Sequence, residues 1–246
     1  MVENKAEKVK PYNPEENKKK QVENMFDNIS GKYDFLNHLL SMGIDKSWRK
    51  NLIKILSQSN PENILDVATG TGDLAIQIAK SIKNCSITGL DISQGMLDVG
   101  IQKIEKQNLE NRVQMLHGDS EKMPFVDESF DAVTAAFGVR NFETLIKGLK
   151  EMHRVLKPGG KVFILEFSKP RTALFRFVFN TYFKYILPGI GKFTSKDPKA
   201  YKYLFESVQA FPSYDDFLKI MQEAGFKSNN FKIQSLGICS IYYGEK

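Results

Sequence analysis

The sequence predicts an α/β fold in which helices cover both faces of a mostly parallel sheet. From residue 62 onward, short apolar runs alternate with segments of helical periodicity, a pattern typical of parallel sheets. The last two apolar runs, near 231–236 and 238–243, are joined only by Leu236-Gly237-Ile238, so an antiparallel hairpin is expected there. The 246 residues suffice for one sizeable domain with a full hydrophobic core.

The N-terminal part is expected to differ from this domain. Residues 1–20 hold six lysines and four glutamates without an apolar run, which predicts a disordered tail. Residues 21–58 have a helical pattern, and Gly31 and Gly43 are expected to interrupt it. We therefore expect a tail, a helical extension over 21–58, and a domain over 59–246.

The elements of the domain follow from the position of apolar residues. Strands are expected at 64–67, 86–90, 113–117, 130–137 and 161–167. Helices are expected at 73–82, 94–107, 143–156 and 213–224, because apolar residues recur there every three or four positions. Pro158-Gly159-Gly160 is expected to end the third of these helices, and Gly225 the fourth.

A glycine-rich turn follows the first predicted strand. Gly70, Thr71 and Gly72 stand where a parallel sheet binds its ligands, at the carboxyl ends of the strands. Asp91 ends the second strand, where a carboxylate can accept hydrogen bonds from both hydroxyls of a ribose. This pattern alone also satisfies a relaxed NAD-binding fingerprint.

Two further features favour S-adenosylmethionine over NAD. Asp66, directly before the turn, would repel a pyrophosphate but suits the positively charged amino-acid end of S-adenosylmethionine. Asp119 and Ser120 follow the third strand, where an acid can accept from the adenine amino group. Each lone acid could instead be a helix cap or turn residue. Together with the reversed last strand, they predict a class I S-adenosylmethionine-dependent methyltransferase: a Rossmann-like, mostly parallel seven-stranded sheet with an antiparallel last strand.

Charge is concentrated in one late segment. Residues 171–205 hold seven Lys or Arg against one Asp, together with ten of the 28 aromatic residues, whereas the net charge of the whole chain is +6. Such a segment suits a membrane surface, a lipid-like substrate or nucleic acid, and a surface helix that buries an aromatic face is the plain alternative. The absence of a secretory pattern, and two cysteines and three histidines without metal-ligand spacing, predict a cytoplasmic, metal-free protein.

Several blocks resemble one enzyme family. Residues 154–168, RVLKPGGKVFILEFS, and 33–48, YDFLNHLLSMGIDKSW, are similar to the two signatures of the C-methyltransferases of menaquinone and ubiquinone biosynthesis. The second stretch departs at Leu36, where Met is usual, and at Asp45, where His is usual. ATGTGD (68–73), FGVRN (137–141) and YKYLFES (201–207) also resemble family blocks, so the likeness covers nearly the whole chain after residue 22.

The resemblance implies a cofactor, an acceptor and a location. Thr71, Asp91, Asp119 and Ser120 would contact S-adenosylmethionine, and the acceptor would be a ring carbon of a polyprenylated quinol. Demethylmenaquinol is the expected acceptor, and the benzoquinol intermediate of ubiquinone biosynthesis is the alternative. The segment 171–208 would then be a lid, and its residues 171–205 would transiently contact the inner face of the membrane. Whether the protein forms a homo-oligomer stays open.

Arg140 and Asn141 follow the fourth predicted strand and are expected to face the acceptor. A quinol carbon becomes nucleophilic when a ring hydroxyl loses its proton, so the reduced form is the expected substrate. Arg140 would stabilise the phenolate or orient a water that takes the proton, because its own pKa, above ~12, prevents it from acting as the base. Asn141 would fix the ring oxygen, and Tyr33 would close over the site by family likeness. A structural turn with a surface ion pair and a packing tyrosine are the alternatives.

Two other functions compete with quinol methylation. An RNA methyltransferase could use the basic, aromatic segment, but the chain has no NPPY-like tetrapeptide and no Pro-Cys nucleophile, so no nucleic-acid partner is expected. A membrane-associated sensor would bind S-adenosylmethionine without turnover.

Overall fold

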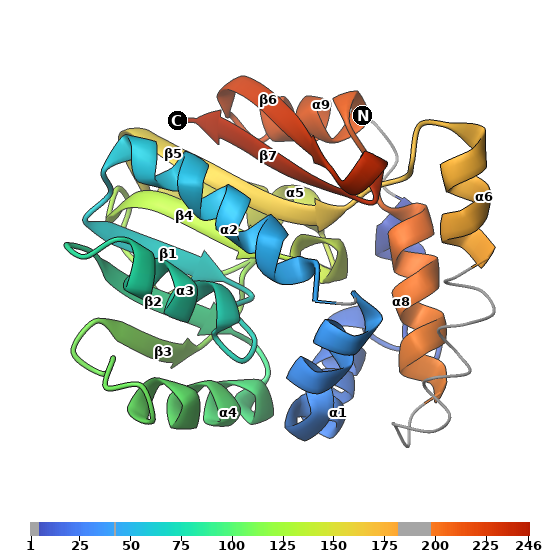
Figure 1. Ribbon diagram of the computed structural model, residues 1–246, viewed down its shortest axis with the longest axis horizontal. Coiled ribbons are helices and arrows are strands. Elements are labelled where there is room, and N and C mark those ends of the chain that lie inside the picture. Colours follow the sequence, from blue (N-terminus) through green and yellow to red (C-terminus); the bar gives the residue numbers. More distant parts are fainter. Residues whose placement is uncertain (1–4, 42, 182–197) are drawn as a thin grey trace.

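The computed structural model describes residues 5–41, 43–181 and 198–246 and centres on a seven-stranded sheet of order β3-β2-β1-β4-β5-β7-β6 (Figure 1). The strands β1 to β5 pair in parallel, and β7 runs antiparallel to both β5 and β6. The predicted sheet, hairpin and reversed last strand are therefore confirmed. The strands are β1 Asn63–Val67, β2 Ser86–Asp91, β3 Val113–His117, β4 Phe130–Ala136, β5 Leu156–Phe167, β6 Lys227–Gln234 and β7 Cys239–Glu245.

Helices cover both faces of this sheet, as expected. One face is packed by α2 (Asp45–Leu56), α3 (Asp73–Ser81) and α4 (Gln94–Glu105), the other by α5 (Leu145–Val155) and α9 (Asp215–Glu223). In α5, Leu145, Leu149 and Met152 recur on one side of the helix. All three are buried in the core that α5 and α9 form with their face of the sheet. This spacing fixes which face of α5 meets the sheet.

The end of α5 differs from the prediction. Leu156 adopts an extended backbone, with φ −72° and ψ 139°, and pairs with Phe130, so the helix ends at Val155 and β5 begins one residue later. Pro158-Gly159-Gly160 lies inside β5 and does not end the helix. The pairing of β4 with β5 shifts register between Phe130 and Ala132, which accommodates the additional residues.

The prediction of a disordered tail is wrong for the described residues 5–20. Lys5–Lys8 forms a 3-10 helix, and the long helix α1 (Lys18–Leu40) already begins within this segment. The Lys18 side chain is only 1% exposed, and its Nζ donates to the carbonyls of Ala6 (2.8 Å), Phe142 (3.0 Å) and Arg140 (3.3 Å). The lysine is buried because carbonyl groups from more than 100 residues away satisfy its ammonium.

The helical extension over 21–58 consists of α1 and α2, but Gly31 does not interrupt it. Gly31 lies inside α1, and no other atom lies within 4 Å of the position its Cβ would take. Gly43 adopts a left-handed backbone with φ +73° between the two helices, as a helix break requires.

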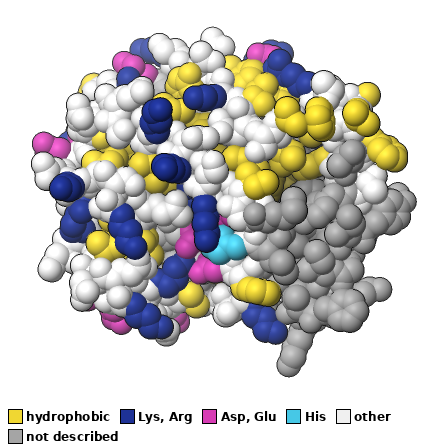
Figure 2. Space-filling model, in the orientation of Figure 1, with side chains coloured by type: hydrophobic (Ala, Val, Ile, Leu, Met, Phe, Trp, Pro, Cys, Tyr) yellow, Lys and Arg dark blue, Asp and Glu magenta, His cyan; other side chains and the backbone are white. Residues whose placement is uncertain are grey.

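The late basic and aromatic segment contributes α6 (Ala173–Thr181) and α8 (Pro198–Ala210). Ala200 and Tyr203 of α8 pack against Val22 and Met25 of α1. Figure 2 shows hydrophobic side chains gathered in the upper right of the molecule, where Figure 1 places α6. Residues 182–197 of the expected lid lie outside the described residues. No described helix is long and apolar enough to cross a membrane.

Candidate active site

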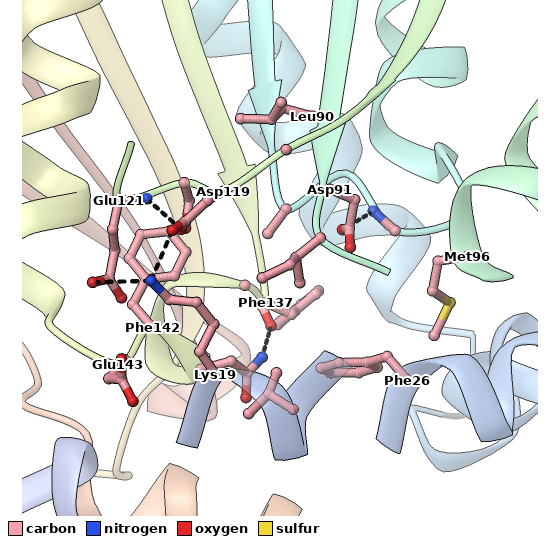
Figure 3. Close-up of a pocket in the computed structure, with 18 of the residues that line it drawn as sticks. Lys19, Phe26, Leu90, Asp91, Met96, Asp119, Glu121, Phe137, Phe142 and Glu143 are labelled. Atoms are coloured by element: carbon pink, nitrogen blue, oxygen red, sulfur yellow. Dashed lines mark hydrogen bonds and ion pairs between the residues drawn. The ribbon is translucent and has the colours of Figure 1, made fainter. Parts of the chain in front are cut away.

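A pocket lies at the carboxyl ends of the parallel strands, and α1 forms its opposite wall (Figure 3). The space between its walls, open solvent included, amounts to about 680 Å³. Of the residues that were predicted to form the site, it is lined by Tyr33, Gly70, Asp91, Asp119, Ser120 and Asn141.

Gly70 and Asp91 form one end of the pocket. Gly70 adopts a left-handed backbone with φ +57°, and its N–H donates to Oδ2 of Asp91 at 2.7 Å. A Cβ on Gly70 would point toward the Tyr33 ring, 4.0 Å from its nearest carbon. Burial raises the pKa of Asp91, although N–H groups such as that of Ser93 bond to its carboxylate and oppose the rise. This end therefore offers a bare backbone and a carboxylate, as a ribose requires.

Asp119 lies on another wall of the pocket and is paired with α1. Its Oδ2 lies 2.7 Å from Nζ of Lys19, and its Oδ1 accepts from the N–H of Glu121 at 2.8 Å. Figure 3 shows the Lys19 ammonium between Asp119 and Glu121, whose Oε2 is 3.6 Å away. An adenine amino group that reaches Asp119 would share this carboxylate with Lys19.

Asp66 does not line the pocket. Its buried carboxylate accepts from the hydroxyls of Thr69 at 2.6 Å and Thr134 at 2.7 Å, so it connects the glycine-rich turn to β4. Burial raises the pKa of Asp66 to about 6, against the effect of these two hydrogen bonds. The side chain expected at the amino-acid end of the cofactor is thus used within the protein, and a direct contact stays a prediction.

Thr71 and Gly72 also lie outside the pocket lining. The Thr71 hydroxyl donates to Oδ1 of Asp34 on α1 and accepts from Lys103 Nζ at 3.2 Å. Gly72 adopts a left-handed backbone with φ +75°, which favours glycine, and a Cβ there would also force the end of the Met115 side chain, 2.7 Å away, to shift. Their contacts with a cofactor likewise stay predictions.

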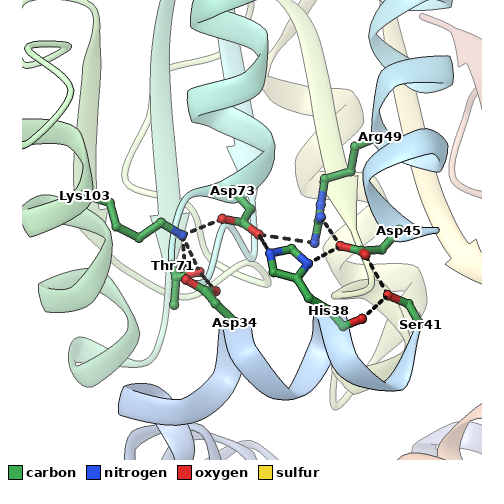
Figure 4. A network of polar contacts seen from close by, with 8 residues as sticks. All are labelled: Asp34, His38, Ser41, Asp45, Arg49, Thr71, Asp73 and Lys103. Atoms are coloured by element: carbon green, nitrogen blue, oxygen red, sulfur yellow. Dashed lines mark hydrogen bonds and ion pairs between the residues drawn. The ribbon is translucent and has the colours of Figure 1, made fainter. Parts of the chain in front are cut away.

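A network of charged side chains joins this turn to the surrounding helices (Figure 4). Lys103 of α4 pairs with Oδ2 of Asp34 at 2.7 Å and with Oδ1 of Asp73 at 2.5 Å. On the other side of Asp73, His38 Nε2 lies 3.6 Å from Oδ2, and His38 Nδ1 lies 2.8 Å from Asp45. Asp45 also pairs with Arg49. The network therefore holds α1, α2 and α4 around the start of α3.

The 3-10 turn Val139–Asn141 follows β4 and carries the expected acceptor residues. Arg140 does not line the pocket but is buried, and its NH1 donates to Oε1 of Glu166 at 2.8 Å and to the carbonyl of Phe137. Its guanidinium carbon lies 5.5 Å from the centre of the Phe167 ring. The ion pair is thus buried, and not on the surface as the alternative interpretation held. Among the described residues, Nε of Arg140 has no hydrogen-bond partner.

Asn141 and Tyr33 face the pocket from opposite walls. Asn141 Oδ1 accepts from the Tyr203 hydroxyl at 3.1 Å, and its Nδ2 lies 3.4 Å from the Phe137 carbonyl. The Tyr33 ring packs edge to face on Phe26, with centroids 5.9 Å apart. Burial raises the pKa of Tyr33, although a hydrogen bond with Asn37 opposes the rise. Tyr33 is therefore a protonated, ring-packed wall of the pocket.

The sequence reasoning did not identify four residues of this region: Lys19, Phe26, Glu166 and Tyr203. Lys19 belongs to a lysine run whose composition resembles a solvated tail. Glu166 lies in the block EFS and Tyr203 in the block YKYLFES. Glu166 could have been found from the sequence, because a buried arginine such as Arg140 needs a carboxylate as its partner. Among the described residues, no group of His, Cys, Asp or Glu is arranged to hold a metal ion.

The family model and the relatives that match this chain all belong to methyltransferases. The model of the ubiE/COQ5 methyltransferase family matches residues 14–246. A demethylmenaquinone methyltransferase of Bacteroides fragilis is 44% identical over 240 residues, which is 98% of each chain. The ubiquinone/menaquinone biosynthesis C-methyltransferase UbiE of Geotalea daltonii is 48% identical over 230 residues, 93% of this chain and 97% of that one.

Solved structures share the fold at lower identity. A SAM-dependent methyltransferase of Aquifex aeolicus superposes with a TM-score of 0.57 and 19% identity, covering 78% of this chain and 87% of that one. The [4+2]-cyclase SpnF superposes with a TM-score of 0.61 and 17% identity, covering 93% and 96%. These similarities confirm the class I methyltransferase fold and, because SpnF is described as a cyclase, they do not by themselves assign an activity.

Proposed function

The chain belongs to the ubiE/COQ5 methyltransferase family, and we propose that it methylates a ring carbon of demethylmenaquinol with S-adenosylmethionine as the donor. The observation that carries the proposal is one pocket that joins the acids Asp91 and Asp119 to Asn141 of the acceptor turn. The proposal is supported by relatives such as the demethylmenaquinone methyltransferase of Bacteroides fragilis.

The pocket fits the proposed cofactor chemically. Asp91 can accept the ribose hydroxyls, Asp119 the adenine amino group, and the bare backbone of Gly70 allows close approach. S-adenosylmethionine would supply an electrophilic methyl group on sulfur. The rings of Phe26, Phe137 and their neighbours line the same space and would exclude water from it.

The residues of the acceptor turn would make the ring carbon nucleophilic. Arg140 carries a permanent positive charge next to Asn141 on the same turn, and this charge would stabilise the phenolate or orient a water that takes the proton. The amide of Asn141 would hold the ring oxygen, and Tyr33 would close the site from α1. Only the reduced quinol has the proton whose loss activates the ring.

We also propose that the protein acts as a peripheral protein at the inner face of the membrane. Leu174, Phe175 and Phe177 of α6 are exposed beside Arg171 and Arg176, which suits an anionic lipid surface. The segment 171–208 would then guide the prenyl chain of the substrate toward the pocket.

Mass spectrometry of a short-chain demethylmenaquinone, incubated with the protein and S-adenosylmethionine with and without dithionite, tests the reaction. Gain of one methyl group only under reduction is the expected result. No gain despite measured cofactor binding would reject this acceptor. The benzoquinol intermediate would be tested next, because UbiE of Geotalea daltonii is named for both quinones. Strongly salt-dependent RNA binding would instead favour the nucleic-acid alternative.

A further inference from the structure

Tyr203 is a buried tyrosine whose hydroxyl contacts the acceptor turn. It lies on α8, within the block YKYLFES, and is only 2% exposed. Its hydroxyl donates to Oδ1 of Asn141 at 3.1 Å. Burial raises the pKa of Tyr203 well above its usual range, although the charge of Arg140 opposes the rise, so the hydroxyl keeps its proton at neutral pH.

The ring of Tyr203 packs against helix α1. It packs with Val22 and Met25 of α1, and Val22 itself lines the pocket. Tyr203 therefore stands where α8, the pocket wall α1 and the acceptor turn meet. Because the ring is buried and closely packed, its hydroxyl is held in one position.

Two partners determine which way the Asn141 amide points. The carbonyl of Phe137 can only accept, so it favours the NH2 group on its side, and the Tyr203 hydroxyl holds the amide oxygen on the other side by donating to it. Nδ2 lies 3.4 Å from the carbonyl of Phe137, a long contact that uses at most one of its two hydrogens. The second hydrogen of this NH2 group is left for a ligand, and Asn141 is one of the residues that line the pocket.

We propose that Tyr203 is a positioning residue that orients Asn141 so that its NH2 group, and not its oxygen, meets the ring oxygen of the acceptor. This inference rests on the proposed function, which brings the acceptor to Asn141. The ring oxygen gains negative charge as its proton leaves, so a donor stabilises the transition state whereas an amide oxygen would repel it. Loss of the hydroxyl should therefore affect kcat more than substrate binding.

Tyr203→Phe, which keeps the ring and removes the hydroxyl, tests this role with reduced demethylmenaquinone as substrate. We expect kcat to fall about 10-fold, as for the loss of one well-placed hydrogen bond, with the KM for the quinol and the Kd for the cofactor nearly unchanged. Tyr242→Phe is the matched control. Tyr242 is equally buried, but its hydroxyl bonds to Ser240 and accepts from the Tyr214 N–H at 3.0 Å, away from Asn141.

A double-mutant cycle separates positioning from general packing. In an Asn141→Ala background, adding Tyr203→Phe should cause no further loss of kcat, because no amide remains to be oriented. An equal loss in both backgrounds, or a kcat of Tyr203→Phe equal to that of Tyr242→Phe, would overturn the inference and leave the proposed function standing. Absence of methylation by the unmodified protein would reject the proposed function, and the inference with it.

Discussion

At the residue scale, Asp66 is a carboxylate whose burial is only partly compensated. Both of its oxygens accept hydroxyl hydrogen bonds, yet burial raises its pKa from 3.8 to about 6. An acid with a raised pKa in the folded state favours folding at low pH, and this contribution is lost as the pH rises through the folded pKa. Asp66 is therefore expected to destabilise the fold at neutral pH relative to pH 4.

Asp66→Asn should remove this dependence on pH. Asparagine keeps one acceptor for Thr69 or Thr134 and donates to the other hydroxyl, but does not ionise. The free energy of unfolding of the unmodified protein, relative to Asp66→Asn, should fall by about 2 kcal/mol between pH 4 and pH 6.5, as measured by urea unfolding. Asp98→Asn, at an exposed position on α4, is the control. A pH-independent difference would contradict the raised pKa.

Arg140 and Glu166 form a buried pair whose two roles can be separated by substitution. Arg140→Ala leaves the Glu166 carboxylate buried without its cation, which should cost about 3–5 kcal/mol of stability. Arg140→Met with Glu166→Gln removes both charges and keeps an acceptor for the Phe167 N–H, so stability should largely return. Methyl transfer should stay low in both variants. Recovery of turnover in the double variant, in the mass-spectrometric assay, would remove Arg140 from the reaction.

The positions of the candidate residues could be predicted from the sequence more fully than the side chains and carbonyls that surround them. Asp91, Asp119 and Asn141 follow strands whose apolar runs are visible, so their place at the carboxyl edge could be predicted. Lys18 could not be predicted as buried. Of the three carbonyls that accept from its ammonium, those of Arg140 and Phe142 lie more than 100 residues further along the chain, and the third is that of Ala6. Such partners depend on tertiary packing and leave no local pattern.

At the scale of elements, the difference between predicted and observed boundaries has the same origin. Strand β3 coincides with its predicted range because its apolar run suffices to define it. The start of β5 depends on pairing of Leu156 with Phe130, and the continuity of α1 through Gly31 depends on the helix being held along its length. Pairing and packing therefore override the local signals of proline and glycine.

Helix α1 contacts the glycine-rich turn and α4 through polar side chains, among them Asp34, which predicts the effect of Asp34→Asn. The change keeps the size of the side chain but removes the charge that pairs with Lys103 at 2.7 Å. We expect a loss of about 1–2 kcal/mol in stability, faster amide hydrogen exchange in α1 and a higher Kd for S-adenosylmethionine.

Glu23→Gln is the matched control on the same helix. Glu23 pairs with Lys20, whose side chain is largely exposed, so its loss should change stability by no more than about 1 kcal/mol. Unchanged exchange in α1 of Asp34→Asn, or equal effects of both variants, would show that apolar packing alone holds the helix.

At the scale of the whole molecule, the pocket combines segments that are distant in sequence. The strand ends supply Gly70, Asp91 and Asp119, while α1 supplies Lys19 and Tyr33. Tyr203 of α8 reaches the same region through Asn141. The wall formed by the strand ends could be predicted because it follows from the order of the parallel sheet. The walls formed by α1 and α8 could not, because nothing local to these helices specifies that they meet.

The exposed apolar side chains of α6 predict that the protein binds to membranes. Leu174 and Phe177 are each 70% exposed, beside the positive charge of Arg176, and insertion of one such apolar side chain is worth about 1.5–3 kcal/mol.

Leu174→Ser with Phe177→Ser should therefore lower the apparent affinity for phosphatidylglycerol-containing vesicles at least about 10-fold, measured by co-sedimentation. Val126→Ser, in the connection before β4, is the control because Val126 is 79% exposed outside this segment. Because the prenyl chain of the proposed acceptor partitions into a bilayer, methylation of long-chain quinol in vesicles should fall more than methylation of a short-chain quinol in solution. Equal vesicle binding by the α6 variant and the Val126 control would show that α6 is not the membrane contact.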